Sequence, residues 1–70
     1  NPSQGDVWVS FEGIYGVSLI KIADIMGKEI QETKPEMGVE TIVFRALPKG
    51  LYIITIRSRE KEYKHKLLVR

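Results

Sequence analysis

The sequence predicts an all-β fold, a small antiparallel β-sandwich, and three observations support this prediction. Apolar and polar residues alternate with a period of two along short segments, which is the pattern of half-buried strands. Turn residues separate these segments about every 8–12 residues, as they do in sandwich proteins. The main competitor, a helix over residues 16–30, is disfavoured by its β-branched residues and by its glycines.

The first two predicted strands cover residues 7–12 and 17–25. In the first strand, two valines and a phenylalanine alternate with Trp8 and polar residues. Gly13 and Gly16 then mark a hairpin-like connection. The second strand is apolar on both faces, which is typical of a strand in the centre of a sheet.

A glycine turn separates the second predicted strand from a third, short and polar strand at residues 28–33. Gly27 occupies a position where a positive φ is expected. Asp24 near this glycine suggests a metal or phosphate loop, but a single acid before a glycine turn more often caps the turn by bonding backbone amides. We therefore expect Asp24 and Gly27 to hold a loop. The sequence KPEMG at residues 34–38 predicts a further turn.

The fourth and fifth predicted strands cover residues 39–44 and 51–57, and residues 47–50, LPKG, form the turn between them. Tyr52 shares one face of the fifth strand with two isoleucines. The sixth predicted strand ends the sequence. On it, two sets of side chains alternate: Tyr63, His65, Leu67 and Val69 on one face, and Lys64, Lys66 and Leu68 on the other.

Length and composition limit the class of protein. Seventy residues are enough for one domain, and the absence of cysteine excludes disulfides and thiolate metal sites. No segment approaches the length of a transmembrane helix or resembles a cleavable signal peptide. Because the chain begins at Asn1 without an initiator methionine, we expect residues 1–70 to be a single domain cut from a longer secreted protein.

The positive charge lies at the end of the chain. Residues 57–70 carry six basic and two acidic residues, a net charge of +4, whereas residues 1–56 sum to −2. Lys64 and Lys66 would lie about 7 Å apart on one strand face. Acidic residues interrupt the basic run and the aromatic residues are needed for the core, so nucleic-acid binding is disfavoured. Lysines on an edge strand also guard against aggregation.

The sequence lacks the polar constellation of an enzyme. His65 is the only histidine, and its place on the face shared with Leu67 favours a half-buried structural residue over a catalytic base. No nucleophile motif, phosphate-binding glycine loop or metal-ligand spacing is present. We therefore expect a protein without catalytic activity, metal or cofactor.

Four stretches of the chain, in this order, resemble one family, the C-terminal sorting domains of the type IX secretion system. NPSQGDVWVSF resembles the family's opening Asn-Pro-x-x-Gly and alternating strand. IKIADIMGKEI is similar to its strand ending in Asp-x-x-Gly-Lys/Arg, and ALPKGLYIITI to its Leu-Pro-x-Gly-x-Tyr turn and strand. YKHKLLVR resembles its last strand, in which a lysine precedes a short aliphatic run. The resemblance covers essentially the whole chain.

The resemblance implies a small immunoglobulin-like sandwich of about six to seven strands. It also implies a role in delivery: such domains end long cargo proteins of Bacteroidetes, often proteases or adhesins. The implied partners are the upstream cargo domain, the outer-membrane secretion machinery and a sortase-like peptidase that removes the domain. The implied route leads through the periplasm to the cell surface or the extracellular space, where the cargo is passed to an anionic lipopolysaccharide or released.

Two stretches depart from the family pattern. Ala23 stands where the family often has an aromatic residue, and residues 44–47, FRAL, replace a more usual Asp-Leu-Ser-Leu run. Both lie in body strands, away from the turn and tail motifs. The implied cleavage site lies upstream of or near Asn1.

The last strand is the expected recognition segment. A strand with free backbone donors and acceptors can pair with a partner's sheet edge, and its lysines would steer it toward an acidic receptor. The expected supports are Pro48 and Gly50, through their backbone preferences, and Tyr52, which packs its ring and leaves its hydroxyl in water. The expected recognition residues are Lys64, Lys66, Leu67, Leu68, Val69 and Arg70.

Two alternatives concern other surfaces. Trp8 lies opposite the apolar face of its strand, and an exposed tryptophan can stack on a sugar, as in a carbohydrate-binding or adhesive module. It can also cover a sheet edge or mark an interdomain contact. A sandwich of few strands also has open edges, and the third hypothesis is therefore a homodimer formed by edge pairing or strand exchange.

Overall fold

The computed structural model describes residues 4–70, and its secondary structure consists of antiparallel strands. The six strands are β1 (Gln4–Ser10), β2 (Leu19–Asp24), β3 (Glu29–Thr33), β4 (Thr41–Pro48), β5 (Gly50–Arg57) and β6 (Glu62–Val69). The described residues include no helix long and apolar enough to cross a membrane. The prediction of an all-β chain is therefore confirmed.

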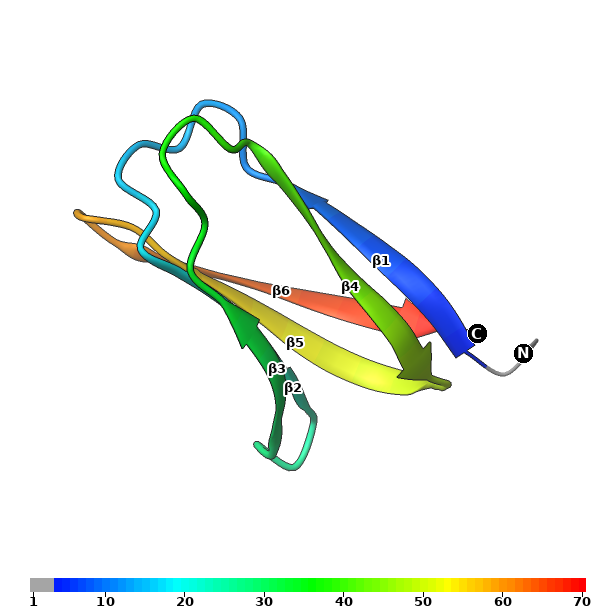
Figure 1. Cartoon of the computed structure of the whole chain (residues 1–70). Coiled ribbons are helices and arrows are strands. Elements are labelled where there is room, and N and C mark those ends of the chain that lie inside the picture. Colours follow the sequence, from blue (N-terminus) through cyan, green and yellow to red (C-terminus); the bar gives the residue numbers. More distant parts are fainter. Residues whose placement is uncertain (1–3) are drawn as a thin grey trace.

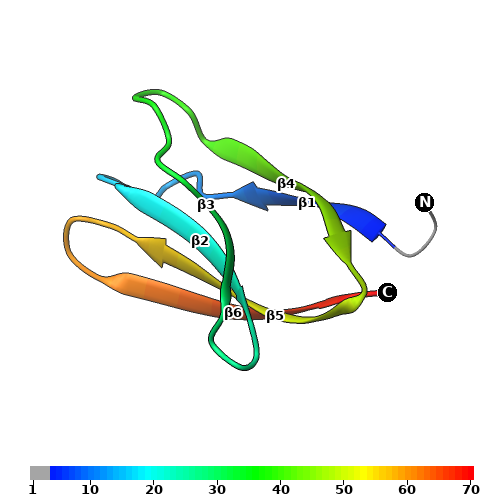
Figure 2. The same cartoon turned by 60° about the horizontal axis from the view of Figure 1, so that its bottom comes forward.

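The strands form two layers. β1 pairs with β4 in one sheet, and the other sheet has the order β3-β2-β5-β6 (Figures 1 and 2). β2 lies between two neighbours, as its apolar residues on both faces predict. However, β1 and β2 belong to different sheets, so the predicted hairpin-like connection between them is wrong; the chain there crosses from one layer to the other. The two layers confirm the small β-sandwich.

The core fills the space between the two sheets. Four large side chains are at most 2% exposed: Phe44, Ile20, Ile22 and Leu47. They come from β4 and from the central strand β2, so each sheet contributes two of them. The remaining buried apolar residues of the cluster are Val9, Phe11, Tyr52, Ile54 and Val69. The last strand therefore belongs to the core through one of its residues.

A β-bulge interrupts the pairing of β1 with β4. One residue of β1, Asp6, lies opposite two residues of β4, Arg45 and Ala46. Ala46 has a φ of 58°, and its N–H donates to Asp6 Oδ1 at 2.9 Å. The extra residue turns Phe44 and Leu47 toward the same core although they are three positions apart. Strict alternation placed the end of this strand too early, at residue 44, whereas β4 continues through the bulge to Pro48.

Candidate recognition surface

The side chains of β6 divide between two faces of the sheet. Val69 is 8% exposed and Leu67 packs at the margin of the core, so these two residues anchor the strand. Lys64, Lys66 and Leu68 are exposed on the opposite face, and we call these three residues the outer row. Arg70, which follows the strand, is also exposed.

His65 differs from the prediction of a half-buried residue. It lies on the same face as Leu67, but its side chain is exposed. The opposing sheet has only two strands, so the middle of the edge strand β6 has less cover than the strands beside it. In the outer row, Leu68 is 54% exposed.

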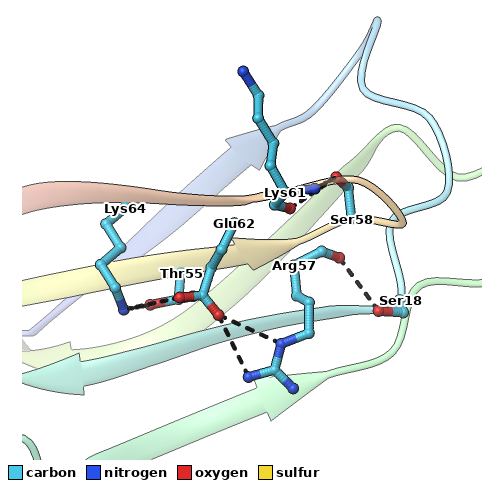
Figure 3. A network of polar contacts seen from close by, with 7 residues as sticks. All are labelled: Ser18, Thr55, Arg57, Ser58, Lys61, Glu62 and Lys64. Carbon is cyan, nitrogen blue, oxygen red and sulfur yellow. Dashed lines mark hydrogen bonds and ion pairs between the residues drawn. The ribbon is translucent and has the colours of Figure 1, made fainter.

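Lys64 belongs to a polar network that joins β5 and β6 (Figure 3). Its Nζ lies 3.5 Å from Glu62 Oε1 and 3.3 Å from Thr55 Oγ1. Glu62 Oε2 in turn lies 3.4 Å from Nε of Arg57. Thr55 is 4% exposed, because the lysine lies over it. Exposed ion pairs of this kind contribute about 0–1 kcal/mol each, so the network orients Lys64 more than it stabilises the fold.

Lys66 has different surroundings. Within the described part of the chain it forms no ion pair, and its cross-strand neighbour is Ile53. The next outward residue, Leu68, lies opposite Leu51. The C-terminal half of the outer row therefore combines an unpaired cation with an exposed aliphatic patch. Such a combination suits a partner with apolar contacts and negative charge.

The predicted support residues lie at the corner between β4 and β5. The Tyr52 hydroxyl donates a hydrogen bond to the carbonyl oxygen of Pro48 at 2.6 Å, and the residue is 5% exposed. The expectation that this hydroxyl stays in water is therefore wrong. The turn is also not a hairpin turn, because β4 and β5 lie in different sheets. Gly50, with a φ of 157°, begins β5 at a conformation that other residues rarely adopt.

The corner and the tail are joined by strand pairing. Gly50 lies opposite Val69, and Tyr52 lies opposite Leu67. The side chains that fix the corner therefore contact the same part of the sheet that positions the end of β6. The structure thus brings these predicted supports beside the predicted recognition segment, although sequence spacing alone does not reveal that they meet.

Asp24 and Gly27 lie in the turn between β2 and β3. Asp24 Oδ1 accepts hydrogen bonds from the backbone N–H groups of Met26 and Lys28, both at 2.9 Å. Gly27 has a φ of 90°, so the expected positive φ is confirmed. These contacts confirm the turn-capping interpretation of Asp24. In residues 4–70, no three potential metal-ligating side chains come together.

Trp8 is exposed on the outer side of the two-stranded sheet. Its side chain is 66% exposed, and the guanidinium carbon of Arg45 lies 5.9 Å from the centre of the ring. Arg45 Nη1 also lies 3.2 Å from Asp6 Oδ2. The sequence does not predict this Asp6–Arg45–Trp8 cluster, because its members come from two strands that are far apart in the chain.

A second feature that sequence analysis missed lies between the loops. A cleft of about 560 Å³ opens between the β1–β2 and β3–β4 connections. Tyr15 and Met37 stand at this cleft with highly exposed side chains, and Arg59 of the β5–β6 turn lines it as well. The signal in the sequence was the presence of large apolar residues inside predicted turns.

Comparison with known proteins identifies the family. The model of the secretion system C-terminal sorting domain matches residues 1–70, the whole chain. No curated protein and no solved structure matches the chain. Domains of this family are non-catalytic sorting signals of type IX secretion, which interact with secretion machinery and are exported to the cell surface or outside. The chain therefore belongs to the C-terminal sorting domains of the type IX secretion system.

Proposed function

We propose that this domain directs an attached cargo protein across the outer membrane of a Bacteroidetes cell, and that a sortase-like peptidase then removes it. The observation that carries the proposal is the family match over residues 1–70. The exposed outer row supports it further, because a sorting signal must offer a surface that other proteins can bind. The cargo, which is absent from this chain, determines any enzymatic activity of the whole protein.

The recognition segment in this proposal consists of Lys64, Lys66, Leu67, Leu68, Val69 and Arg70. Its members have two tasks. Leu67 and Val69 fix the strand on the core, where they are half-buried and buried. The exposed residues of the segment contact the receptor. Pro48, Gly50 and Tyr52 hold the neighbouring strand in place, and Asp24 with Gly27 holds the loop at the end of β2.

A reporter fusion tests the sorting function. The chain is placed behind a fluorescent reporter that carries a signal for crossing the inner membrane. We expect fluorescence outside cells that have the type IX machinery and periplasmic fluorescence in cells that lack it. Removal of the residues after Lys64 should retain the reporter in the periplasm. Equal export with and without the machinery would contradict the proposal.

The same fusion tests the peptidase step. The expected cleavage position lies upstream of or near Asn1, outside the described residues. The mass of the released reporter, measured with and without the peptidase, locates the cut. Release of the intact fusion in both strains would show that this domain is exported without removal.

We infer in addition that the sandwich is immunoglobulin-like. Its strand order supports the assignment: β1–β4 against β3-β2-β5-β6 is the pairing of strands B–E against C′-C-F-G in that fold. The bond from Tyr52 to Pro48 resembles the tyrosine corner at its E–F connection. An experimental structure in which β4 pairs with β5 as a hairpin would contradict the assignment.

A carbohydrate-binding or adhesive module is the second candidate function. The specific observation in its favour is the exposed ring of Trp8, with Asp6 and Arg45 beside it as hydrogen-bonding groups. Affinity electrophoresis through gels containing polysaccharides tests it. This function predicts retention that Trp8→Ala abolishes, whereas equal mobility of both proteins on every glycan would remove it.

We also propose that open edges permit a homodimer, by pairing at β1 or β4 or by exchange of β6. The two-stranded sheet supports this, because each of its strands has an unpaired edge. Light scattering across a dilution series measures the mass. A monomer at every concentration would contradict the dimer and leave the sorting function untouched.

A further inference from the structure

The closing turn of the β5–β6 hairpin determines where the backbone groups of β6 point. Paired residues of antiparallel strands alternate between hydrogen-bonded and non-hydrogen-bonded pairs. At the turn, the N–H of Ser58 donates to the carbonyl of Lys61 at 2.9 Å, so these residues form a bonded pair. Counted along the register from there, the residues of β6 that bond to β5 are Tyr63, His65, Leu67 and Val69. The residues whose N–H and C=O groups face the open edge are Glu62, Lys64, Lys66 and Leu68.

The central strand β2 gives independent support for this assignment. The N–H of Asp24 donates to the carbonyl of Lys28 in the turn at 2.9 Å, so the backbone of Asp24 points away from β5. Asp24 lies opposite Tyr52, and this pair is therefore not bonded across β2 and β5. The backbone groups of Tyr52 must face β6, where its partner is Leu67. The Ser58–Lys61 bond and the Asp24–Lys28 bond therefore give the same alternation of bonded and non-bonded pairs between β5 and β6.

The outer row therefore combines two properties in the same residues. Lys64, Lys66 and Leu68 present their side chains on the outer face and their backbone groups to the open edge. A strand added at this edge would place every second side chain on the outer face, directly opposite these three residues. The open edge of β6 and the side chains of the outer row together form one binding site. This site recognises both the backbone and the side-chain pattern of the added strand.

We propose that a strand of the secretion machinery pairs antiparallel with the open edge of β6, with an aliphatic residue opposite Leu68 and acidic residues opposite Lys66 and Lys64. This proposal rests on the sorting function above and names the chemistry of the partner. The antiparallel direction follows the pairing of β5 with β6 and every other pairing in the sheet.

The surroundings of each position set the partner's pattern. Lys66 has no ion pair within residues 4–70, so an incoming carboxylate meets an uncompensated cation. Lys64 already forms an ion pair with Glu62, so a second carboxylate at this position contributes less to the binding free energy. Leu68 lies beside Leu51, so an aliphatic side chain opposite it extends an existing apolar contact. From its N-terminal side, the partner strand should therefore have an aliphatic residue opposite Leu68, an acidic residue two positions later and a second acidic residue two positions after that. Any residue can occupy the two positions between them.

A second copy of the chain fits this edge poorly. Antiparallel pairing of two β6 strands about Lys66 places lysine opposite lysine, which is destabilising. The opposite edge strand, β3, carries Glu29 and Glu32, and a register shift between them turns both acids to the same face. With these acids opposite Lys66 and Lys64, however, the position that faces Leu68 is Gly27, which precedes β3 and has no aliphatic side chain. Pairing between two different edges also does not close into a dimer. The occupant is therefore a different protein.

Hydrogen exchange measured by NMR on the full chain tests the proposal. The probe is the synthetic peptide Thr-Val-Val-Glu-Thr-Glu-Thr, blocked at both ends, which carries the proposed pattern. In the free chain, the amides of Lys64, Lys66 and Leu68 should exchange quickly, because they have no partner strand. With the peptide at saturation they should exchange at least about tenfold more slowly, while the already paired amides of His65 and Leu67 change little.

A peptide of the same composition is the matched control. In Thr-Val-Val-Glu-Glu-Thr-Thr the acids are adjacent, so only one of them can face the outer row in any register. It should bind several-fold more weakly. The variant Lys66→Glu should lose affinity for the first peptide and gain affinity for its counterpart with lysines in place of both glutamates. Equal binding of the two acidic peptides, or binding without protection of the outward amides, would overturn the proposal.

An anionic surface is the remaining competitor, and the same measurements distinguish it. Vesicles containing phosphatidylglycerol could attract the lysines, but they would not protect the outward amides of the edge. Vesicle binding that depends on Lys66, together with no peptide-induced protection, would therefore overturn strand addition. In the reporter assay, export can depend on the machinery and yet be unchanged by Lys66→Glu. This result would contradict the proposed pairing but not the sorting function.

Discussion

The corner between β4 and β5 and the outer row of β6 lie near each other but differ in their exposure. At the corner, Leu47 is 0% exposed and the hydroxyl of Tyr52 is bonded within the protein. In the outer row, Leu68 is more than half exposed and Lys66 has no ion pair within residues 4–70. Buried, satisfied groups stabilise a fold, whereas exposed groups beside an unpaired edge are available for binding. If the outer row is the recognition surface, as proposed above, stability and recognition depend on different residues.

This separation matters for experiments on sorting. A substitution that abolishes export can act by unfolding the domain or by removing a contact with the receptor. We expect substitutions at the corner to act in the first way and those in the outer row to act in the second. Measurements of stability and export on the same variants therefore distinguish the two effects.

The largest contrast concerns two leucines. Leu47→Ala should lower the free energy of unfolding by about 2–5 kcal/mol, because it leaves a cavity in the core. Leu68→Ala should change it by less than about 0.5 kcal/mol. Urea denaturation followed by circular dichroism measures both variants. A similar loss for both leucines would mean that the outer row is part of the core in solution.

The hydrogen bond of the corner should have an intermediate effect. Tyr52→Phe keeps the ring and removes the donor to the Pro48 carbonyl, which should cost about 1 kcal/mol. The variant is compared with wild type in the same denaturant titration. Tyr63→Phe is the control, since this half-buried tyrosine has no hydrogen bond from its hydroxyl within the described residues. If both variants lose equal stability, the corner bond has no special role.

The bulge predicts a stabilising substitution. Ala46 has a φ of 58°, a left-handed conformation that costs an L residue about 1 kcal/mol or more and glycine little. Ala46→Gly should therefore raise the free energy of unfolding by about 0.5–1 kcal/mol. Ala23→Gly in β2, where the backbone φ is negative, should lower it by a similar amount. A loss of stability in Ala46→Gly would argue against the bulge.

The smallest change in stability should accompany the largest change in export. Lys66→Glu should alter the free energy of unfolding by less than about 0.5 kcal/mol and strongly reduce reporter secretion. Lys34→Glu makes the same charge change in the β3–β4 loop and should leave secretion intact. Denaturation and reporter fluorescence are measured on both variants. Equal secretion by the two would break the link between the outer row and recognition.

Much of the architecture could be predicted from the sequence, because period-two alternation depends on local chemistry. The central place of β2 and the inward face shared by Tyr52 and Ile54 follow from it directly. The turn cap of Asp24 also followed, since the hydrogen bonds of a carboxylate next to a glycine are local. Lys64 and Lys66 of the candidate site were predicted from the same alternation, which places both on one face of the last strand.

The remaining features depend on contacts between distant segments. Whether a turn joins two strands of one sheet or crosses to the other sheet is decided by pairing far along the chain, so the prediction of a hairpin-like connection after β1 was wrong. The bulge has one local sign, two large apolar residues, Phe44 and Leu47, at an odd spacing. The exposure of His65 depends on how few strands the opposing sheet has.

The contact between the first strand, β1, and the last strand, β6, has a consequence for the export of misfolded chains. A side chain at Gly5 would lie 3.6 Å from Cγ1 of Val69, so β1 closes over the end of β6. Val69 is buried, so the end of β6 is covered by β1 in addition to being paired with β5. We expect an unfinished or misfolded chain to contain the same residues without the folded β6 strand that displays them. Under the proposed sorting function, a receptor that binds this strand would therefore favour the export of folded domains.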